Sequence, residues 1–330
     1  MSGIHGRNAF KAALLILPLL GLSGCIEYTI DTTLNPDGSG LRKARIEATN
    51  ADELAEYNLS TGDFTDLLFL GEQNGWSHET HVDDGDTTHV FQRETRVSGL
   101  TAWSRLNDDL RISGALPSKS ASTIGYVTLG NVQFRNRVLV GSSRRSDGSS
   151  SFSYLETLSW EDGVDALLEV IVQQMDRYIT DAFPALSAMD RGEILGLARA
   201  RLWEAVEDGV LDSSGDDEDE MWSGAVDRTV DQAIRVVRKQ YPDAEEEALR
   251  AGLDVFSGEA EEEFLQGLVE TLPGLNLAIN SEVSFRLTMP GRITNTNAHE
   301  QDGNTLIWEF APTDGLTAPI VILAESVAGG

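Results

Sequence analysis

Three of the five histidines lie close together in the sequence, beside three aspartates, and could ligate a metal ion. His78 and His81 precede the run Asp83-Asp84-Gly85-Asp86, and His89 follows it. Imidazole and carboxylate groups bind zinc and similar metals, but a zinc site needs three or four ligands that converge. Whether these side chains converge depends on the β-hairpin that the Asp-Gly turn predicts between two strand-like stretches.

The register of this hairpin argues against a three-histidine site. With Asp84-Gly85 as the central turn residues, Thr80 pairs with His89. Facing residues share one side of a sheet and neighbours alternate, so His81 and His89 fall on opposite faces. His78 shares a face with His89 only as a diagonal neighbour, about 7 to 8 Å away along the backbone. We therefore predict polar strand positions and no metal site, although a register shift of one residue would alter the facing argument.

An acidic run from Asp212 to Glu220 could suggest a calcium-binding loop. Counted from Asp212, the sixth residue is Asp217 where an EF-hand loop needs glycine, and the twelfth is Ser223 where it needs glutamate. We interpret the run as a solvated linker, or as an acidic first turn that suits the dipole of the following helix. Weak binding of divalent cations stays open, and no cofactor is predicted.

Motifs for nucleophilic or cofactor-based catalysis are missing from the sequence. It contains no Gly-x-Ser-x-Gly elbow, no His-Glu-x-x-His pair, no Gly-x-x-x-x-Gly-Lys loop and no Gly-x-Gly-x-x-Gly fingerprint. The 54 acidic residues are so numerous that a glycosidase-like carboxylate pair would arise by number alone. We expect a protein that is not an enzyme and name no catalytic residue; a carboxylate-based hydrolase is the least favoured function.

The only cysteine, Cys25, directly follows the one long apolar segment of the chain. Arg7 and Lys11 supply positive charge before the apolar residues 12–22, as in a secretory signal peptide. At about 11 to 13 residues the segment is short for a transmembrane helix, which needs about 20. Leu22-Ser23-Gly24-Cys25 resembles the lipobox of bacterial lipoproteins. In such proteins a signal peptidase recognises the residues before the cysteine, which then carries acyl chains such as palmitate.

We therefore predict a signal peptide over residues 1–24 and a mature protein that acyl chains on Cys25 hold at the membrane. Two or more chains make a durable anchor, at about 0.8 kcal/mol per buried methylene. A plain secretory peptide, or an incidental buried thiol, is the alternative. The predicted location is the extracytoplasmic face of a bacterial membrane. Ile26 replaces the Asp that marks retention in the inner membrane, which favours the outer membrane if the organism has one.

The charge balance excludes some partners. Lys and Arg number 25 against the 54 acidic residues, so the surface repels nucleic acid and anionic lipid headgroups. Residues 161–272 hold 29 of the acidic and 9 of the basic residues, a net of −20. The simplest explanation is a solvated surface, and a patch that binds a cationic partner is the alternative. We expect the acidic stretch to face away from an anionic membrane.

The residue pattern divides the chain into three parts. Alternating apolar and polar residues predict strands in the N-terminal part of a sheet domain, residues 25–160, and again in 273–330. Between them, residues 161–272 show apolar positions three and four apart, which predict four or five helices. The predicted fold is α+β: an antiparallel sheet domain interrupted by an all-α insertion.

Both ends of the mature chain resemble the LppM-type family of bacterial lipoproteins. The N-terminal resemblance is Cys25-Ile26-Glu27-Tyr28 leading into a strand, with a turn at Asp37-Gly38. The C-terminal one runs from Val283 through the Pro290-Gly291 turn to Asn295, and from Asp302 to Trp308. The resemblance implies a membrane-anchored domain with a helix-grip-like antiparallel sheet, possible binding of an apolar or lipidic ligand, and no catalytic residues.

Trp308 alternates with Leu306 and Phe310, which places three large apolar side chains on one face of a strand. Core packing is the simpler role for them, and lining a ligand cavity is the alternative. We expect a non-catalytic, lipid-anchored protein of the cell envelope that binds an apolar or lipidic ligand or aids envelope assembly. The competing hypothesis is an adaptor whose acidic helices bind a protein partner.

Overall fold

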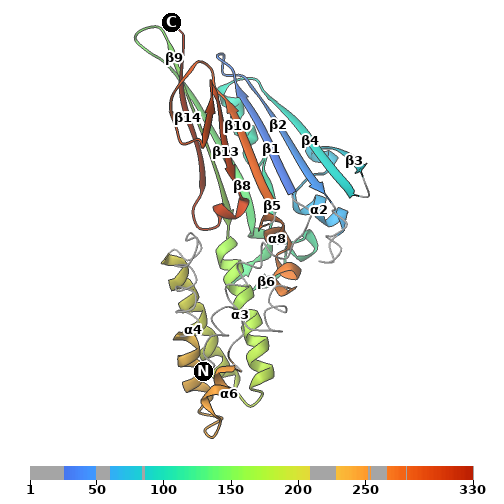
Figure 1. Cartoon of the computed structure of the whole chain (residues 1–330), viewed down its shortest axis with the longest axis vertical. Coiled ribbons are helices and arrows are strands. Elements are labelled where there is room, and N and C mark those ends of the chain that lie inside the picture. Colours follow the sequence, from blue (N-terminus) through green and yellow to red (C-terminus); the bar gives the residue numbers. More distant parts are fainter. Residues whose placement is uncertain are drawn as a thin grey trace. The chain divides into compact units, whose positions relative to one another are not determined.

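The computed structural model describes residues 26–49, 60–83, 86–208, 228–251, 253, 266–279 and 281–329 (Figure 1). They form an α+β protein with mainly antiparallel sheets, which confirms the predicted fold class. The chain divides into a sheet unit, residues 21–120, 130–163 and 272–330, and a helical unit that includes residues 121–129 and 164–271. Residues 121–129, predicted within the sheet domain, thus cluster with the helices. The domain boundaries predicted from the sequence remain predictions.

The larger sheet has seven strands in the order β12-β13-β10-β1-β2-β4-β3. Its strands are antiparallel except for β1 and β10, which run parallel and join the two ends of the chain. The strands are β1 Ile26–Leu34, β2 Gly40–Thr49, β3 Ser77–Asp83, β4 Asp86–Val97, β10 Ser281–Thr288, β12 Glu300–Asp302 and β13 Thr305–Phe310.

A second sheet has five strands in the order β11-β14-β9-β8-β5, so the strands of this unit lie in two sheets rather than in one curved sheet. Its longest pair, β8 with β9, is a hairpin that closes through a turn at residues 145–149. The strands are β5 Arg111–Ser113, β8 Gln133–Arg144, β9 Ser150–Glu161, β11 Arg292–Thr296 and β14 Ile320–Ala328. The C-terminal β14 lies in the stretch 273–330, where alternation predicts strands.

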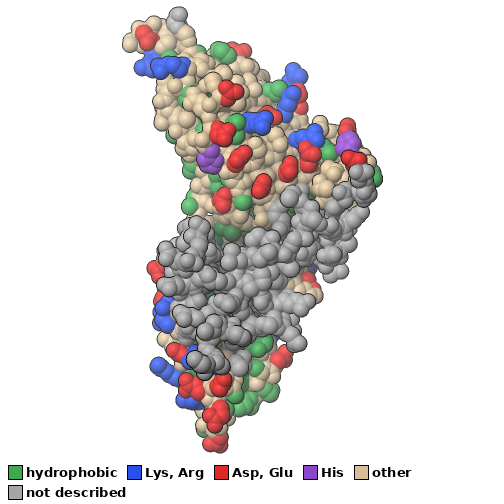
Figure 2. Space-filling model, in the orientation of Figure 1, with side chains coloured by type: hydrophobic (Ala, Val, Ile, Leu, Met, Phe, Trp, Pro, Cys, Tyr) green, Lys and Arg blue, Asp and Glu red, His purple; other side chains and the backbone are tan. Residues whose placement is uncertain are grey.

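The core of the sheet unit lies between the two sheets. Strands β1 and β9 alternate buried and more exposed residues, as the period of two predicts. Tyr154 of β9 packs at a ring-centroid distance of 6.4 Å from Phe285 of β10, and at 6.0 Å from Trp103. Charged side chains of both signs are interspersed on the outward face that Figure 2 shows.

Short helices complete the sheet unit. Ser60 and Asp63 form a capping box that starts α2, Thr61–Leu67. The other helical segments are the 3-10 turns η3 Glu72–Asn74, η4 Leu100–Leu106, η5 Pro117–Lys119, η6 Leu129–Asn131 and η7 Pro312–Gly315, and the helix α8 Pro273–Ile279.

The helical unit contains α3 Gly163–Ala182, α4 Ala188–Glu207 and α6 Glu246–Ala251, with further helix at residues 228–237 and 266–271. The two-stranded hairpin β6 Thr123–Ile124 and β7 Val127–Thr128 lies in the same unit. Arg199 of α4 donates two hydrogen bonds, of 2.6 and 2.8 Å, to the buried carboxylate of Glu169 in α3. No helix among the described residues has the length and apolar character needed to cross a membrane.

Candidate functional site

A network of buried polar side chains lies between the two sheets. Arg42 occupies an inward-facing position of β2 and is 1% exposed, and Glu156 occupies one of β9 and is fully buried. The Arg42 guanidinium donates to both Glu156 oxygens, at 3.1 and 2.5 Å, and to the Tyr154 hydroxyl at 2.6 Å. Its Nε donates to Thr32 Oγ1 at 3.1 Å. The two sheets are thus joined by a bidentate ion pair.

Each of the two carboxylate oxygens of Glu156 accepts hydrogen bonds from two donors. The Tyr154 hydroxyl donates to Oε2, and the amide of Asn136 donates to Oε1 at 2.5 Å. Asn136 also donates to the Leu106 carbonyl and accepts from the Leu110 N–H, both at 3.0 Å. A buried carboxylate satisfied in this way holds the structure together, and burial keeps it out of reach of a dissolved substrate.

Burial governs how these groups titrate. Burial raises the pKa of the Tyr154 phenol well above its usual value, so Tyr154 stays protonated and donates its hydrogen bond. Burial is the largest effect on the pKa of Arg42 and lowers it, but the charges of Glu156, Tyr154 and Asp109 and the hydrogen bond to Glu156 together outweigh burial, so the pKa is raised. Arg42 is therefore a permanent cation in the core.

Asp109 extends the network towards a pocket. Arg93 Nη2 lies 2.5 Å from Asp109 Oδ1, and Arg42 Nη1 lies 3.9 Å from Oδ2. The Asp109 side chain is 8% exposed, and its Oδ2 has no hydrogen-bond partner among the described residues. Burial raises the pKa of the Asp109 carboxyl above its usual value, although Arg93 and Arg42 oppose the shift.

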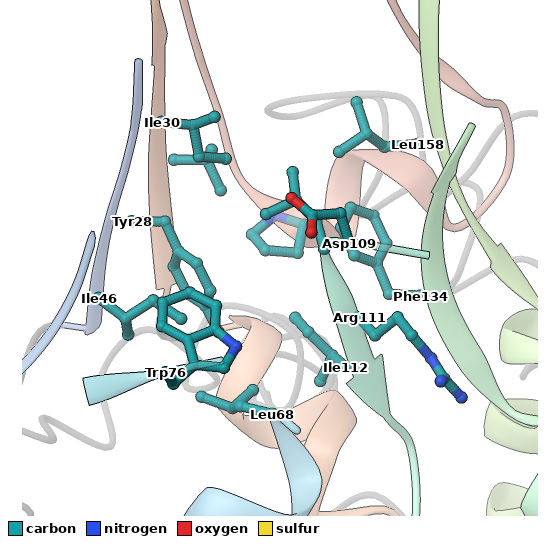
Figure 3. Close-up of a pocket in the computed structure, with 13 residues that line it drawn as sticks. Tyr28, Ile30, Ile46, Leu68, Trp76, Asp109, Arg111, Ile112, Phe134 and Leu158 are labelled. Atoms are coloured by element: carbon teal, nitrogen blue, oxygen red, sulfur yellow. The ribbon is translucent and has the colours of Figure 1, made fainter. Parts of the chain in front are cut away.

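The pocket lies inside the sheet unit and has mainly apolar walls (Figure 3). Asp109 points into it between Ile30 and Phe134, whereas the guanidinium of Arg111 points away and lies 4.0 Å from the centre of the Phe69 ring. The cavity has a volume of about 20 Å³, room for about one water molecule. The lining residues are Tyr28, Ile30, Ile46, Leu68, Trp76, Asp109, Leu110, Arg111, Ile112, Phe134, Leu158, Val283 and Pro312.

This pocket can hold a water molecule or a small polar group but no acyl chain in the structure as it stands. The Tyr28 hydroxyl also has no hydrogen-bond partner among the described residues, and burial raises the pKa of Tyr28. Tyr28 and Asp109 therefore offer polar atoms to a guest; Arg111 Nε also lacks a partner among the described residues, but its guanidinium points away from the pocket. A larger guest would have to displace side chains such as Trp76 or Leu68.

The predicted cavity residues lie elsewhere on the inner face. Leu306 and Trp308 are buried on β13, and Phe310 is half-buried. Trp308 packs edge-on against Phe285 at 6.0 Å and donates from Nε1 to Asn297 Oδ1 at 3.0 Å. The three residues are not among those that line the pocket described above. Their role in lining a ligand cavity stays a prediction.

The register predicted for the histidine hairpin is confirmed. Thr80 pairs with His89, and His81 pairs with Thr88. His78 lies on the face of His89, as predicted, and the two side chains meet. The described residues contain no group of three or more side chains that could hold a metal ion. The lipobox Leu22-Ser23-Gly24-Cys25 and the acidic run 212–220 lie outside the described residues.

Sequence reasoning missed the buried network, although the sequence carries a signal for it. Strand β9 places Tyr154, Leu158 and Trp160 on one face, and Glu156 has the same phase. Arg42 likewise shares its phase with the buried Ala44 of β2. A charged residue at an apolar position of an alternating strand indicates a buried partner of opposite charge.

Comparison with known proteins gives little beyond this geometry. No family model matches the chain, and no curated protein matches it. Among solved structures, the NMR structure of the folded domain of Mycobacterium tuberculosis LppM is similar at a TM-score of 0.28 and 8% identity, over 93% of this chain and 91% of that one. A likeness of this size carries no argument on function, and membership of the LppM-type family stays a prediction.

Proposed function

We propose that the protein is a lipid-anchored, non-catalytic component of the bacterial cell envelope that aids envelope assembly. In this proposal acyl chains on Cys25 tether the chain, the sheet unit is a rigid support, and the helical unit binds a partner. The observation that carries it is the small size of the pocket between the two sheets. Next to the hydrogen-bonded Arg42–Glu156 pair, the pocket that the described residues line has a volume of only about 20 Å³, which favours a support over a lipid carrier.

The charges of the helical unit indicate the kind of partner. Among the described residues, ion pairs with acidic residues of the same unit are formed by six of the nine basic residues in 161–272. The acidic residues outnumber them, so the surplus charge on the surface is negative. A cationic protein surface would complement it, and such complementarity speeds association and selects the partner. The paired basic residues are Arg191, Arg199, Arg201, Arg238, Lys239 and Arg250.

Uptake of a small ligand in the sheet unit is a second candidate function. It is favoured by the apolar pocket and by Asp109 Oδ2, which has no hydrogen-bond partner among the described residues. The ligand would have to be small, or the pocket would have to open. Retention of an acyl lipid by the sheet unit would favour this candidate over the support.

The two candidates are separated by purifying the full-length protein from bacterial membranes. Mass spectrometry of the N-terminal peptide should show acylated Cys25, and native mass spectrometry should show no lipid retained beyond the anchor. Cross-linking in intact cells should join the helical unit to a basic protein, and the yield should fall with rising salt.

A pair of matched variants tests the role of the helical charges. Replacing the exposed Glu207, Asp243, Glu245 and Glu247 by amides should reduce the cross-link several-fold. The control removes the same number of charges from the sheet unit, at Glu27, Asp31, Glu282 and Glu309, and should leave the cross-link unchanged. Equal loss in both variants, or a lipid bound in the sheet unit, would overturn the proposal.

A further inference from the structure

Two histidines meet across the β3–β4 hairpin. In its register His78 faces Phe91, and Thr80 faces His89. The diagonal pair His78 and His89 brings Nε2 of the first within 2.9 Å of Nδ1 of the second. Two ring nitrogens of different strands thus point at each other on one face of the hairpin.

The sheet holds the His78 ring in place. It stacks on the Phe91 ring with a centroid distance of 4.4 Å and an angle of 7° between the planes. Phe91 is itself buried, at 1% exposure, so it forms a fixed platform. The His89 ring is nearly parallel to the His78 ring, with an angle of 19° between the planes and a centroid distance of 5.2 Å. Packing therefore orders this pair before any ligand arrives.

The separation of the two nitrogens fits that of two ligands on one metal ion. Metal–nitrogen bonds of about 2.0 to 2.1 Å place two imidazole nitrogens about 2.9 Å apart at a right angle, or about 3.3 Å apart in a tetrahedron. In this contact one of the two nitrogens carries the hydrogen-bonding proton. A change of tautomer on that ring, with small changes in the side-chain torsions, would direct a lone pair of each ring towards a common ion. We propose that His78 and His89 form a two-histidine binding site for a divalent transition-metal ion.

The chemistry of the pair selects the class of metal. Imidazole ligands suit copper, nickel and zinc, and affinities for a given site peak at Cu²⁺. The described residues add no third side chain of the usual metal-binding types, so the site is proposed on two imidazole ligands. The hydroxyl of Thr80, 3.5 Å from His78 Nε2, lies beside the open positions. Such a site exchanges its metal readily and differs from a closed structural zinc site.

His81 provides a matched control on the same hairpin. It faces Thr88 on the opposite side of the strand pair and lies 3.8 Å from Glu79 rather than near His78. Its removal changes the histidine content of the protein to the same extent as removal of His78. It should leave the proposed site intact.

The test is titration of the tag-free protein with CuCl₂, followed by calorimetry and by electron paramagnetic resonance of the bound Cu²⁺. Wild type should show one site with two coordinated nitrogens. His78→Asn and His89→Gln should each weaken that site at least tenfold and reduce the nitrogen count to one, while His81→Asn should match wild type. All four proteins should have the same circular dichroism, because His78 is exposed and His89 is only half-buried.

Three outcomes would overturn the proposal. One is the absence of a nitrogen-coordinated site in wild type. A second is Cu²⁺ bound through oxygen ligands only, which would place the ion on the acidic surface. The third is equal loss in the His81→Asn variant, which would show that no particular pair binds the ion. If no site forms, the 2.9 Å contact is a hydrogen bond that ties the two strands together.

Discussion

Arg42 carries a full charge in the centre of the sheet unit, where an unpaired charge would cost several kcal/mol. The structure offsets that cost with hydrogen bonds to Glu156, Tyr154 and Thr32. A buried pair of this kind adds little net stability compared with apolar side chains of the same volume. We infer that it fixes how the two sheets align, since the bidentate geometry accepts one arrangement of β2 against β9.

Breaking the pair from one side should therefore be costly. Glu156→Gln leaves the buried Arg42 without its counter-charge, and we expect the free energy of unfolding to fall by about 3 kcal/mol. Urea unfolding monitored by tryptophan fluorescence measures it. Glu47→Gln is the matched control: Glu47 pairs with Arg45 on the exposed face, and that change should cost less than about 1 kcal/mol. Equal losses would show that the buried pair has no special role.

Asp109 should give the protein a recognisable pH dependence. Because burial raises its pKa in the folded state, folding favours the protonated carboxyl. The stability that this group contributes is fully present below the unfolded-state pKa of about 3.9 and is lost as the pH rises through the folded-state pKa. The difference in unfolding free energy between wild type and Asp109→Asn should thus decrease as the pH rises from about 3 to 7. A difference that is flat or increases would contradict the shift.

In the helical unit, the β6–β7 hairpin depends on one glycine. Gly125 has φ +55°, and a Cβ atom there would overlap the buried carboxylate of Glu169, which Arg199 holds. Beside it, the Tyr126 hydroxyl donates to Asp165 Oδ1 at 2.6 Å. The hairpin thus packs against α3 only because residue 125 has no side chain.

Gly125→Ala should lower the free energy of unfolding by about 2 to 4 kcal/mol, because it adds overpacking to the cost of a left-handed conformation. Gly303 is the matched control, since it has φ +63° but nothing within 4 Å of a Cβ atom. Gly303→Ala should cost about 1 to 2 kcal/mol. Hydrogen exchange should show faster opening of α3 in the first variant and unchanged exchange there in the second.

The sequence pattern predicts where the strands lie better than it predicts which strands pair with each other. The β3–β4 register agrees with the one predicted from Asp84-Gly85 in the sequence, because a predicted two-residue turn leaves one pairing for each strand residue. The parallel pairing of β1 with β10 and the division into two sheets did not follow from the sequence. Alternation tells which residues face the core but not which distant strand lies alongside. The sequence did not reveal the pocket for the same reason, since β1, β2 and β9 contribute residues to its wall only after they assemble.

At the scale of the molecule, the proposed lipid anchor on Cys25 determines which end of the sheet unit lies at the membrane. Cys25 directly precedes β1, whose first residue, Ile26, pairs with Ala48 and Ser281. The turn at residues 35–39 closes the other end of the same strand pair, and the β8–β9 turn at 145–149 lies at that far end too (Figure 1). A twelve-residue strand such as β8 spans about 40 Å. Acylation of Cys25 should therefore hold the Ile26 end against the bilayer and the two turns far from it.

Single-cysteine labels can test this orientation, because acylation leaves Cys25 without a free thiol. Val82 is 71% exposed on the β3–β4 hairpin, which extends past the level of Ile26, and Ser146 is exposed in the far turn. A fluorophore on Val82→Cys should be quenched by nitroxide-labelled lipids, and one on Ser146→Cys should not. Adding Cys25→Ser to either variant should abolish membrane binding and all quenching. Quenching at Ser146 instead would mean that the sheet unit is not held by its N-terminal end, and would remove the anchor on which the proposed support depends.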